Sequence, residues 1–255
     1  VPIRFKRERN NQRDQIPYKI FPYNCGSNSG LYECLKEINS VIPDNSQYTL
    51  KCDINIYWRL VNYFYTPSKQ EITNTFVPFL GVWHIFKISV IKVFQFFCNS
   101  FLADCCFAIN INTVFSTPSL PFALTIFLYI FPIIPRLKQH INSLLTRCSN
   151  IYFDHLYNLY TLLDNWIPSI IDFGIAISSS NFELFIERLP QILLILIECK
   201  CHSYTSVIFI FLSQINYWFK FHKEYYKHIR DHFDAFIEEK NEIYISKYSG
   251  WYSVS

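Results

Sequence analysis

The chain of 255 residues has no methionine and only 5 glycines, and this scarcity limits the classes of protein to which it can belong. Phosphate-binding loops, dinucleotide fingerprints and nucleophile elbows need glycine at fixed positions, and none of these patterns occurs. Zinc-protease motifs are absent as well, so the sequence gives no argument for catalysis. Because residue 1 is valine, we expect a processed or truncated product from which any targeting segment has been removed.

Charge is also scarce, whereas aromatic side chains are abundant. Charged residues make up 17% of the chain and aromatic residues 19%, with 25 Phe and 18 Tyr, which excludes a disordered or collagen-like protein. Phe, Tyr, Ile, Asn and Lys are all encoded by AT-rich codons, so an AT-rich genome raises the apparent hydrophobicity. No Asn-x-Ser/Thr acceptor site occurs, and this disfavours a glycosylated ectodomain.

Two long runs lack charge entirely. Residues 118–135 (PSLPFALTIFLYIFPIIP) would form a helix of about 27 Å, close to the roughly 30 Å of a hydrocarbon core. Residues 203–219 (SYTSVIFIFLSQINYWF) end in Tyr217 and Trp218, which precede Lys220, an order typical of a membrane interface. The two runs predict a membrane protein that binds lipid, and the sequence indicates no other cofactor.

The remaining periodicity predicts a mainly α fold, a small multi-helix membrane-associated bundle. Its loop-rich N-terminal region contains at least one β-strand, because apolar and polar residues alternate over residues 48–56. Residues 136–166 carry apolar side chains at helical spacing and predict one long amphipathic helix, which we expect Pro168 to end. Ser180 and Glu183 form a capping-box pattern that opens another helix, and Pro190 is expected to bend or split it.

Composition divides the chain into three regions. Residues 1–75 form a loop-rich, basic-tailed region, residues 76–220 an apolar helical region with the candidate spans, and residues 221–255 an amphipathic helix with a C-terminal tail. The first thirteen residues carry five cations, which could remain solvated, anchor the chain at a membrane, or contact nucleic acid. Nucleic acid is the least favoured partner, because only Phe5 interleaves with these cations as a stacking platform.

Two groups of side chains could bind a metal. Glu224, His228 and His232 are spaced four residues apart and share one helix face, although the same spacing fits the solvated side of an amphipathic helix. Cys199, Cys201 and His202 supply two sulfurs and an imidazole within four residues. A zinc site would need a fourth ligand, and paired cysteines usually lie two residues apart rather than one.

Three carboxylates lie in or beside apolar segments, where a charge must find a partner or a water-filled cavity. They are Asp104, Asp172 and Glu187. If the chain were a small receptor, channel or transporter, these residues would line the polar path.

Three classes of function remain. The leading hypothesis is a non-catalytic integral membrane accessory subunit that binds lipid and other subunits of a larger complex, for which a mitochondrial inner membrane would be a fitting location. The first alternative is a small membrane receptor, channel or transporter. The second is a soluble, Phe-rich helical scaffold, because buried helices of large proteins can also be apolar on all sides.

Overall fold

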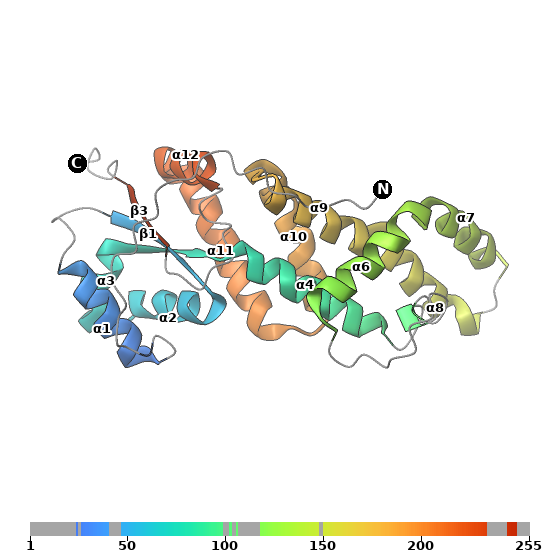
Figure 1. Cartoon of the computed structure of the whole chain (residues 1–255), viewed down its shortest axis with the longest axis horizontal. Coiled ribbons are helices and arrows are strands. Elements are labelled where there is room, and N and C mark those ends of the chain that lie inside the picture. The colour runs from blue at the N-terminus through green and yellow to red at the C-terminus, as the bar shows by residue number, and fades with distance from the viewer. Residues whose placement is uncertain are drawn as a thin grey trace. The chain divides into compact units, whose positions relative to one another are not determined.

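The computed structural model describes residues 24, 27–40, 47–98, 102–103, 106, 118–147, 150–233 and 244–248. The described part is mainly helical and includes one small β-sheet, as the sequence predicted (Figure 1). Its residues divide into two compact units. Unit 1 comprises Val1–His84, Ser178–Phe182 and Ser206–Ser255, and unit 2 comprises Ile85–Ile177 and Glu183–Thr205.

Unit 1 is built around a sheet of three strands in the order β2-β1-β3. Strand β1 (Gln47–Cys52) pairs in parallel with β2 (Phe76–Leu80) and antiparallel with β3 (Tyr244–Tyr248). Tyr48, Leu50 and Cys52 are buried, and so is Thr49 between them, because β1 is the central strand and both of its faces are covered. The alternation in the sequence predicted only one buried face.

The predicted strand over residues 48–56 is correct for its first part and wrong after Cys52. Asp53 ends the strand because its Oδ1 accepts a hydrogen bond of 2.8 Å from the amide of Ile56, which caps the N-terminus of α2 (Ile54–Phe64). Ile54 and Ile56 fit both an alternating and a helical pattern. The cap formed by Asp53 favours the helix.

The crossover from β1 to β2 carries three helical elements: α2, the 3-10 turn η1 (Pro67–Lys69) and α3 (Gln70–Thr75). Helix α1 (Asn28–Asn39) precedes β1 and is capped by Ser27, whose Oγ accepts from the amide of Gly30 at 3.0 Å. A Cβ at Gly30 would lie 2.2 Å from the carbonyl oxygen of Asn24, so this position requires glycine.

Helices α11 (His202–Phe221) and α12 (Lys223–Asp231) complete unit 1, although α11 begins in unit 2. The buried face of α11 carries Phe211, whose ring meets those of Tyr57 at 5.9 Å and Phe79 at 5.0 Å. Polar contacts reinforce this packing, because Gln214 accepts from the hydroxyl of Tyr57 at 2.7 Å and donates to the carbonyl of Pro78 at 3.2 Å. One side of the second charge-free run therefore packs against protein.

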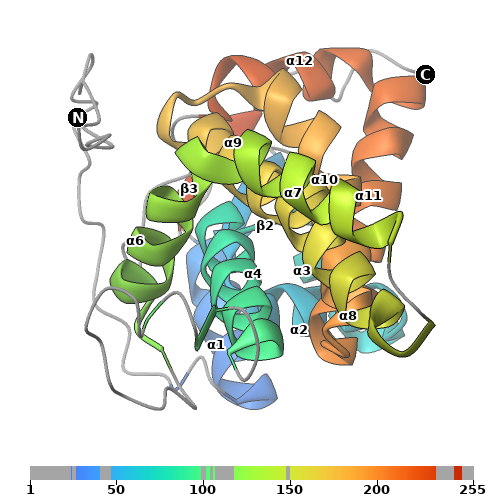
Figure 2. The ribbon, with the colours of Figure 1, turned by 90° about the vertical axis from the view of Figure 1, so that its right-hand side faces the viewer.

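Unit 2 consists of helices, and Figure 2 shows several of them from one end. Helix α4 (Val82–Phe97) begins in unit 1 and continues into unit 2. Later in the chain, α6 (Leu120–Ile130), the 3-10 turn η2 (Phe131–Ile133) and α7 (Ile134–Leu145) form one continuous helical segment. Phe94 of α4 contacts Phe122 at 5.6 Å and Phe127 at 6.2 Å between ring centroids, so α6 packs beside α4 (Figure 2).

The long helix predicted over residues 136–166 is wrong as a single element. Helix α7 ends at Leu145, a turn follows at Thr146, and α8 runs over Asn150–Thr161. Apolar side chains keep helical spacing on both sides of this turn, and their periodicity alone therefore hides the interruption.

Pro168 does not end the helix that precedes it. A π-helical turn, η3 (Leu162–Trp166), leads directly into α9 (Ile167–Ser178), and the amide of Ile167 bonds to the carbonyl of Leu162 five residues back. The wider turn changes the hydrogen-bond register immediately before Pro168, which has no amide hydrogen to donate. Helix α10 (Phe182–Glu198) likewise continues through Pro190.

Candidate functional site

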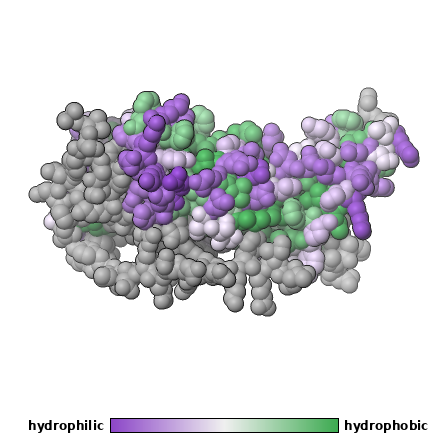
Figure 3. Space-filling model, turned by 90° about the horizontal axis from the view of Figure 1, so that it is seen from above, coloured by the Kyte–Doolittle hydropathy of each residue, from purple (hydrophilic) through white to green (hydrophobic). Residues whose placement is uncertain are grey.

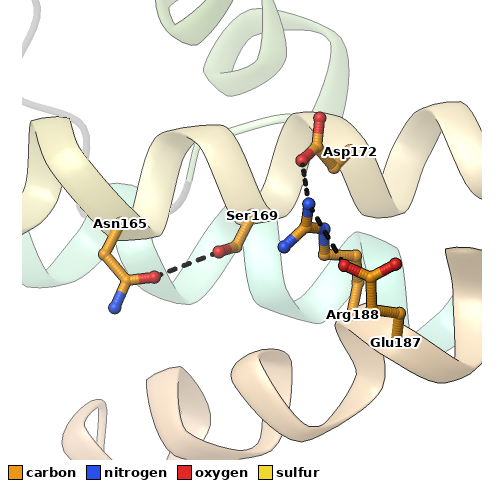
Figure 4. Close-up of polar contacts among 5 residues, drawn as sticks. All are labelled: Asn165, Ser169, Asp172, Glu187 and Arg188. Carbon is orange, nitrogen blue, oxygen red and sulfur yellow. Dashed lines mark hydrogen bonds and ion pairs between the residues drawn. The ribbon is translucent and has the colours of Figure 1, made fainter.

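A polar cluster in unit 2 joins two of the carboxylates that the sequence singled out. Nη2 of Arg188, on α10, lies 3.0 Å from Oδ2 of Asp172 on α9 and 3.6 Å from Oε1 of Glu187 (Figure 4). Asp172 and Glu187 are fifteen positions apart in the sequence, and Arg188 brings them together. The sequence alone did not indicate Arg188, because neighbouring residues on a helix do not face each other and its partner Asp172 comes from another helix.

The three side chains differ in their access to solvent. Those of Arg188 and Asp172 are 29% and 33% exposed, whereas that of Glu187 is 63% exposed. Nε of Arg188 is buried and has no hydrogen-bond partner among the described residues. The guanidinium is therefore held mainly by Asp172, and Glu187 lies at the outer edge of the cluster.

Two more polar side chains lie near this cluster, one in α9 and one in the η3 turn before it. The buried Ser169 donates a hydrogen bond of 3.1 Å from its Oγ to Oδ1 of Asn165, one turn earlier (Figure 4). Ser169 is buried and Asp172 half-buried, whereas the other buried residues of α9 are apolar, and Asn165 lies exposed in the preceding η3 turn. These contacts join amide, hydroxyl, carboxylate and guanidinium groups. The arrangement suits a clasp between helices better than a reaction centre, because no nucleophile is paired with a base.

The first metal candidate is partly assembled in unit 1. The rings of His228 and His232 lie 4.5 Å apart between centroids, as their spacing on one helix face predicted, and Nδ1 of His232 is 2.9 Å from the carbonyl oxygen of His228. Glu224, on the same helix, is exposed. Across the part of the chain that the structure describes, no three His, Cys, Asp or Glu side chains are grouped closely enough to hold a metal ion.

The second metal candidate lies at the corner between α10 and α11. Burial raises the pKa of Cys199 to about 12, with a further contribution from Cys201, while Lys92 lowers it in part. Burial raises the pKa of Cys201 as well. Burial thus favours the protonated form of both thiols in the metal-free chain. His202 begins α11 and is exposed.

Asp104, the remaining carboxylate candidate, lies outside the described residues. The basic residues before Asp14 lie outside them too.

An apolar segment of unit 2 is the second candidate site. Leu120–Leu145, formed by α6, η2 and α7, is the only helical segment among the described residues that is long and apolar enough to cross a membrane. Only 28% of the residues in its most apolar window are buried by the protein. The sequence predicted two such segments. Helix α11, which contains the second charge-free run, is not apolar enough to meet the same criterion.

The exposed part of this segment carries large side chains. Tyr129 is 67% exposed and Ile133 45%, while Ala123, Ile126, Phe127 and Ile130 form the buried stripe. The stripe repeats every three or four residues, so one face of the helix packs on the rest of unit 2, and its other side chains are half-buried or exposed among the described residues.

Comparisons with known proteins found no match to any family model, to any curated protein or to any solved structure. Function must therefore be argued from the chain itself.

Proposed function

We propose that this chain is a non-catalytic accessory subunit of a membrane complex and is held in the bilayer by Leu120–Leu145. The observation that carries the proposal is that this segment, among the described residues, is long and apolar enough to cross a membrane while 28% of its most apolar window is buried by protein. Exposed apolar helix is unfavourable in water by roughly 25 cal/mol per Å². A hydrocarbon environment removes that cost.

Cations follow the charge-free part of this segment and give it an orientation. Residues 118–135 contain no charge, and Arg136 and Lys138 follow at once. Lys138 forms an ion pair with Asp164 and lies 5.4 Å from the centre of the Tyr160 ring, whereas Arg136 is exposed. Cations at the end of a span favour the cytoplasmic or matrix side, so we place α7 on that side, with a mitochondrial inner membrane as the fitting location.

The character of the polar groups supports an accessory role. Arg188 neutralises Asp172 within a clasp between α9 and α10, and neither metal candidate has a complete set of ligands among the described residues. Many large apolar side chains remain exposed in each unit, which suits contact with lipid and with other subunits. We propose no cofactor other than bound lipid.

A soluble helical scaffold is the second candidate, and α11 favours it. Although charge-free over residues 203–219, this helix buries Val207, Ile208, Phe211, Ile215 and Trp218 within the protein. If Leu120–Leu145 were covered in the same way by a partner protein, no bilayer would be needed. A receptor, channel or transporter is less favoured, because the charge of Asp172 is already paired.

Extraction of membranes with alkaline carbonate separates these functions. We expect the full chain to remain in the membrane pellet, and release into the supernatant would exclude integral insertion. Purification in a mild detergent should then yield fixed stoichiometric partners. A chain that purifies alone, and whose expression changes ion or solute flux in vesicles, would contradict the accessory role in favour of transport.

A further inference from the structure

The end of α11 and the whole of α12 place cations and aromatic rings together on the surface of unit 1. We call this group the corner patch. Its cations are Lys220, Lys223, Lys227 and Arg230, and its aromatic members are Tyr217, Phe219 and Phe221; all seven side chains are exposed.

The buried face of α12 fixes the direction of the cations. Tyr225 and Ile229 are fully buried, and the hydroxyl of Tyr225 hydrogen-bonds to Oγ1 of Thr49 on β1 at 2.7 Å. The Tyr225 ring also meets Trp218 of α11 edge to face at 4.8 Å. Because Lys223, Lys227 and Arg230 are spaced by four and three residues, they share the helix face opposite to these anchors.

Among the described residues, most of these cations have no carboxylate partner. Arg230 lies 3.0 Å from Asp231, but no carboxylate within the described ranges pairs with Lys220, Lys223 or Lys227. The carboxylates between Lys220 and Asp231 are Glu224 and Asp231 itself, against four cations. In Figure 3, which shows the side of unit 1 that carries α12, hydrophilic and hydrophobic residues adjoin.

Aromatic rings flank these cations at the α11–α12 junction. Phe221 is 69% exposed and Phe219 57%, and the Tyr217 ring packs against Phe221 at 5.2 Å. His222 links the two helices, since its Nε2 lies 3.2 Å from the hydroxyl of Tyr217. Lysines beside exposed Phe and Tyr are the combination found where proteins lie in the headgroup region of a bilayer.

We propose that the corner patch binds the headgroups of anionic phospholipids, with its lysines on the phosphates and its aromatic rings at the acyl boundary. A lipid surface explains both halves of the patch, whereas an acidic polymer would use the cations alone. The inference deepens the proposed function, because it gives unit 1 a lipid contact of its own. It does not depend on insertion of Leu120–Leu145.

Hydrogen exchange on the full chain tests the proposal. The protein is reconstituted in vesicles of phosphatidylcholine alone or mixed with phosphatidylserine, and amide exchange is followed over Lys223–Asp231. Each basic residue near an anionic membrane surface adds to the free energy of binding, and removing three of them should lower the affinity for phosphatidylserine vesicles about 100-fold. We therefore expect slower exchange with phosphatidylserine, and loss of this protection at high salt or in the triple variant Lys223→Gln, Lys227→Gln, Arg230→Gln.

The matched control removes the same charge elsewhere. Lys36→Gln, Lys87→Gln and Lys200→Gln change exposed lysines outside the patch and should leave the protection intact. Phe221→Ser should weaken binding to anionic vesicles but not to polyglutamate. Equal exchange in both kinds of vesicle, an equal loss in the control, or a preference for polyglutamate over phosphatidylserine would each overturn the proposal.

Failure of the proposed function gives a different result. If Leu120–Leu145 does not insert, the chain stays in solution with phosphatidylcholine vesicles, and flotation then measures binding to phosphatidylserine vesicles directly. The wild-type chain should float with them and the triple variant should bind about 100-fold more weakly. Absence of flotation in the wild type would reject the corner patch independently of insertion.

Discussion

Leu120–Leu145 and α11 both contain charge-free runs, but they differ in hydropathy and in the polar contacts that they make within the protein. Both runs are rich in Phe, Ile and Leu. A similar share of each is buried: 28% of the most apolar window of the first, and five of the 20 residues of α11. Among the described residues only the first is apolar enough to cross a membrane, whereas α11 carries Gln214, which hydrogen-bonds to Tyr57 and Pro78. The absence of charge alone therefore does not show whether protein or lipid surrounds a helix.

The largest expected effect tests the packing of α11. Phe211→Ala removes a fully buried ring that contacts Tyr57 and Phe79, so it should lower the free energy of unfolding by about 3 to 5 kcal/mol. The matched change Phe209→Ala, on the same helix at 63% exposure, should alter it by less than about 0.5 kcal/mol. Chemical denaturation of both variants measures the difference. Equal losses would mean that α11 has no distinct buried face.

The next effect tests lipid contact of α6. Tyr129→Asp should raise the apparent free energy of membrane insertion by about 2.5 to 3.5 kcal/mol, because the new carboxylate would lie within hydrocarbon. Phe209→Asp in α11 is the control and should leave insertion unchanged. The carbonate-resistant fraction of each variant gives the answer, and a loss confined to Phe209→Asp would reverse the assignment of the two helices.

A smaller effect is expected in the polar cluster. Asp172→Asn leaves the half-buried Arg188 without its main carboxylate and should cost about 1 to 3 kcal/mol of stability. Glu187→Gln should have little effect, since Glu187 is exposed and 3.6 Å from the guanidinium. A double-mutant cycle with Arg188→Met, followed by denaturation, isolates the pair. No coupling between positions 172 and 188 would show that the clasp does not stabilise unit 2.

The smallest effect at neutral pH concerns Cys199, just before α11. Burial raises its pKa to about 12, so folding favours the protonated thiol. The resulting stabilisation is present below the pKa of an unfolded thiol, about 8.5, and is lost as the pH rises towards 12. Cys199→Ser should flatten this alkaline decline in denaturation midpoints. Alkylation of Cys199 at pH 8 should also be slower in the folded chain, and equal rates before and after denaturation would contradict burial of this thiol.

Part of this structure could be predicted from local patterns. Alternation located β1, and helical spacing placed His228 and His232 on one face. Each of these features depends on a few neighbouring residues. Such local patterns can be recognised in the sequence without knowledge of the fold.

The rest depends on contacts between distant residues. Arg188 was missed because its partner Asp172 lies on another helix, and β2 was missed because its hydrogen bonds come from β1 and Pro78 interrupts its pattern. Pro168 was misread because a π-turn precedes it. The burial of α11 was missed for the same reason, since its neighbours Tyr57 and Phe79 are more than 130 positions away.

Labelling with a photoactivated probe that dissolves in the hydrocarbon phase tests the central claim most directly. The full chain is irradiated in its native membrane, digested, and the labelled residues are located by mass spectrometry. We predict labels on the exposed residues of Leu120–Leu145, including Tyr129 and Ile133, and none on the buried face of α11. An unlabelled Leu120–Leu145 would contradict insertion and favour the soluble scaffold.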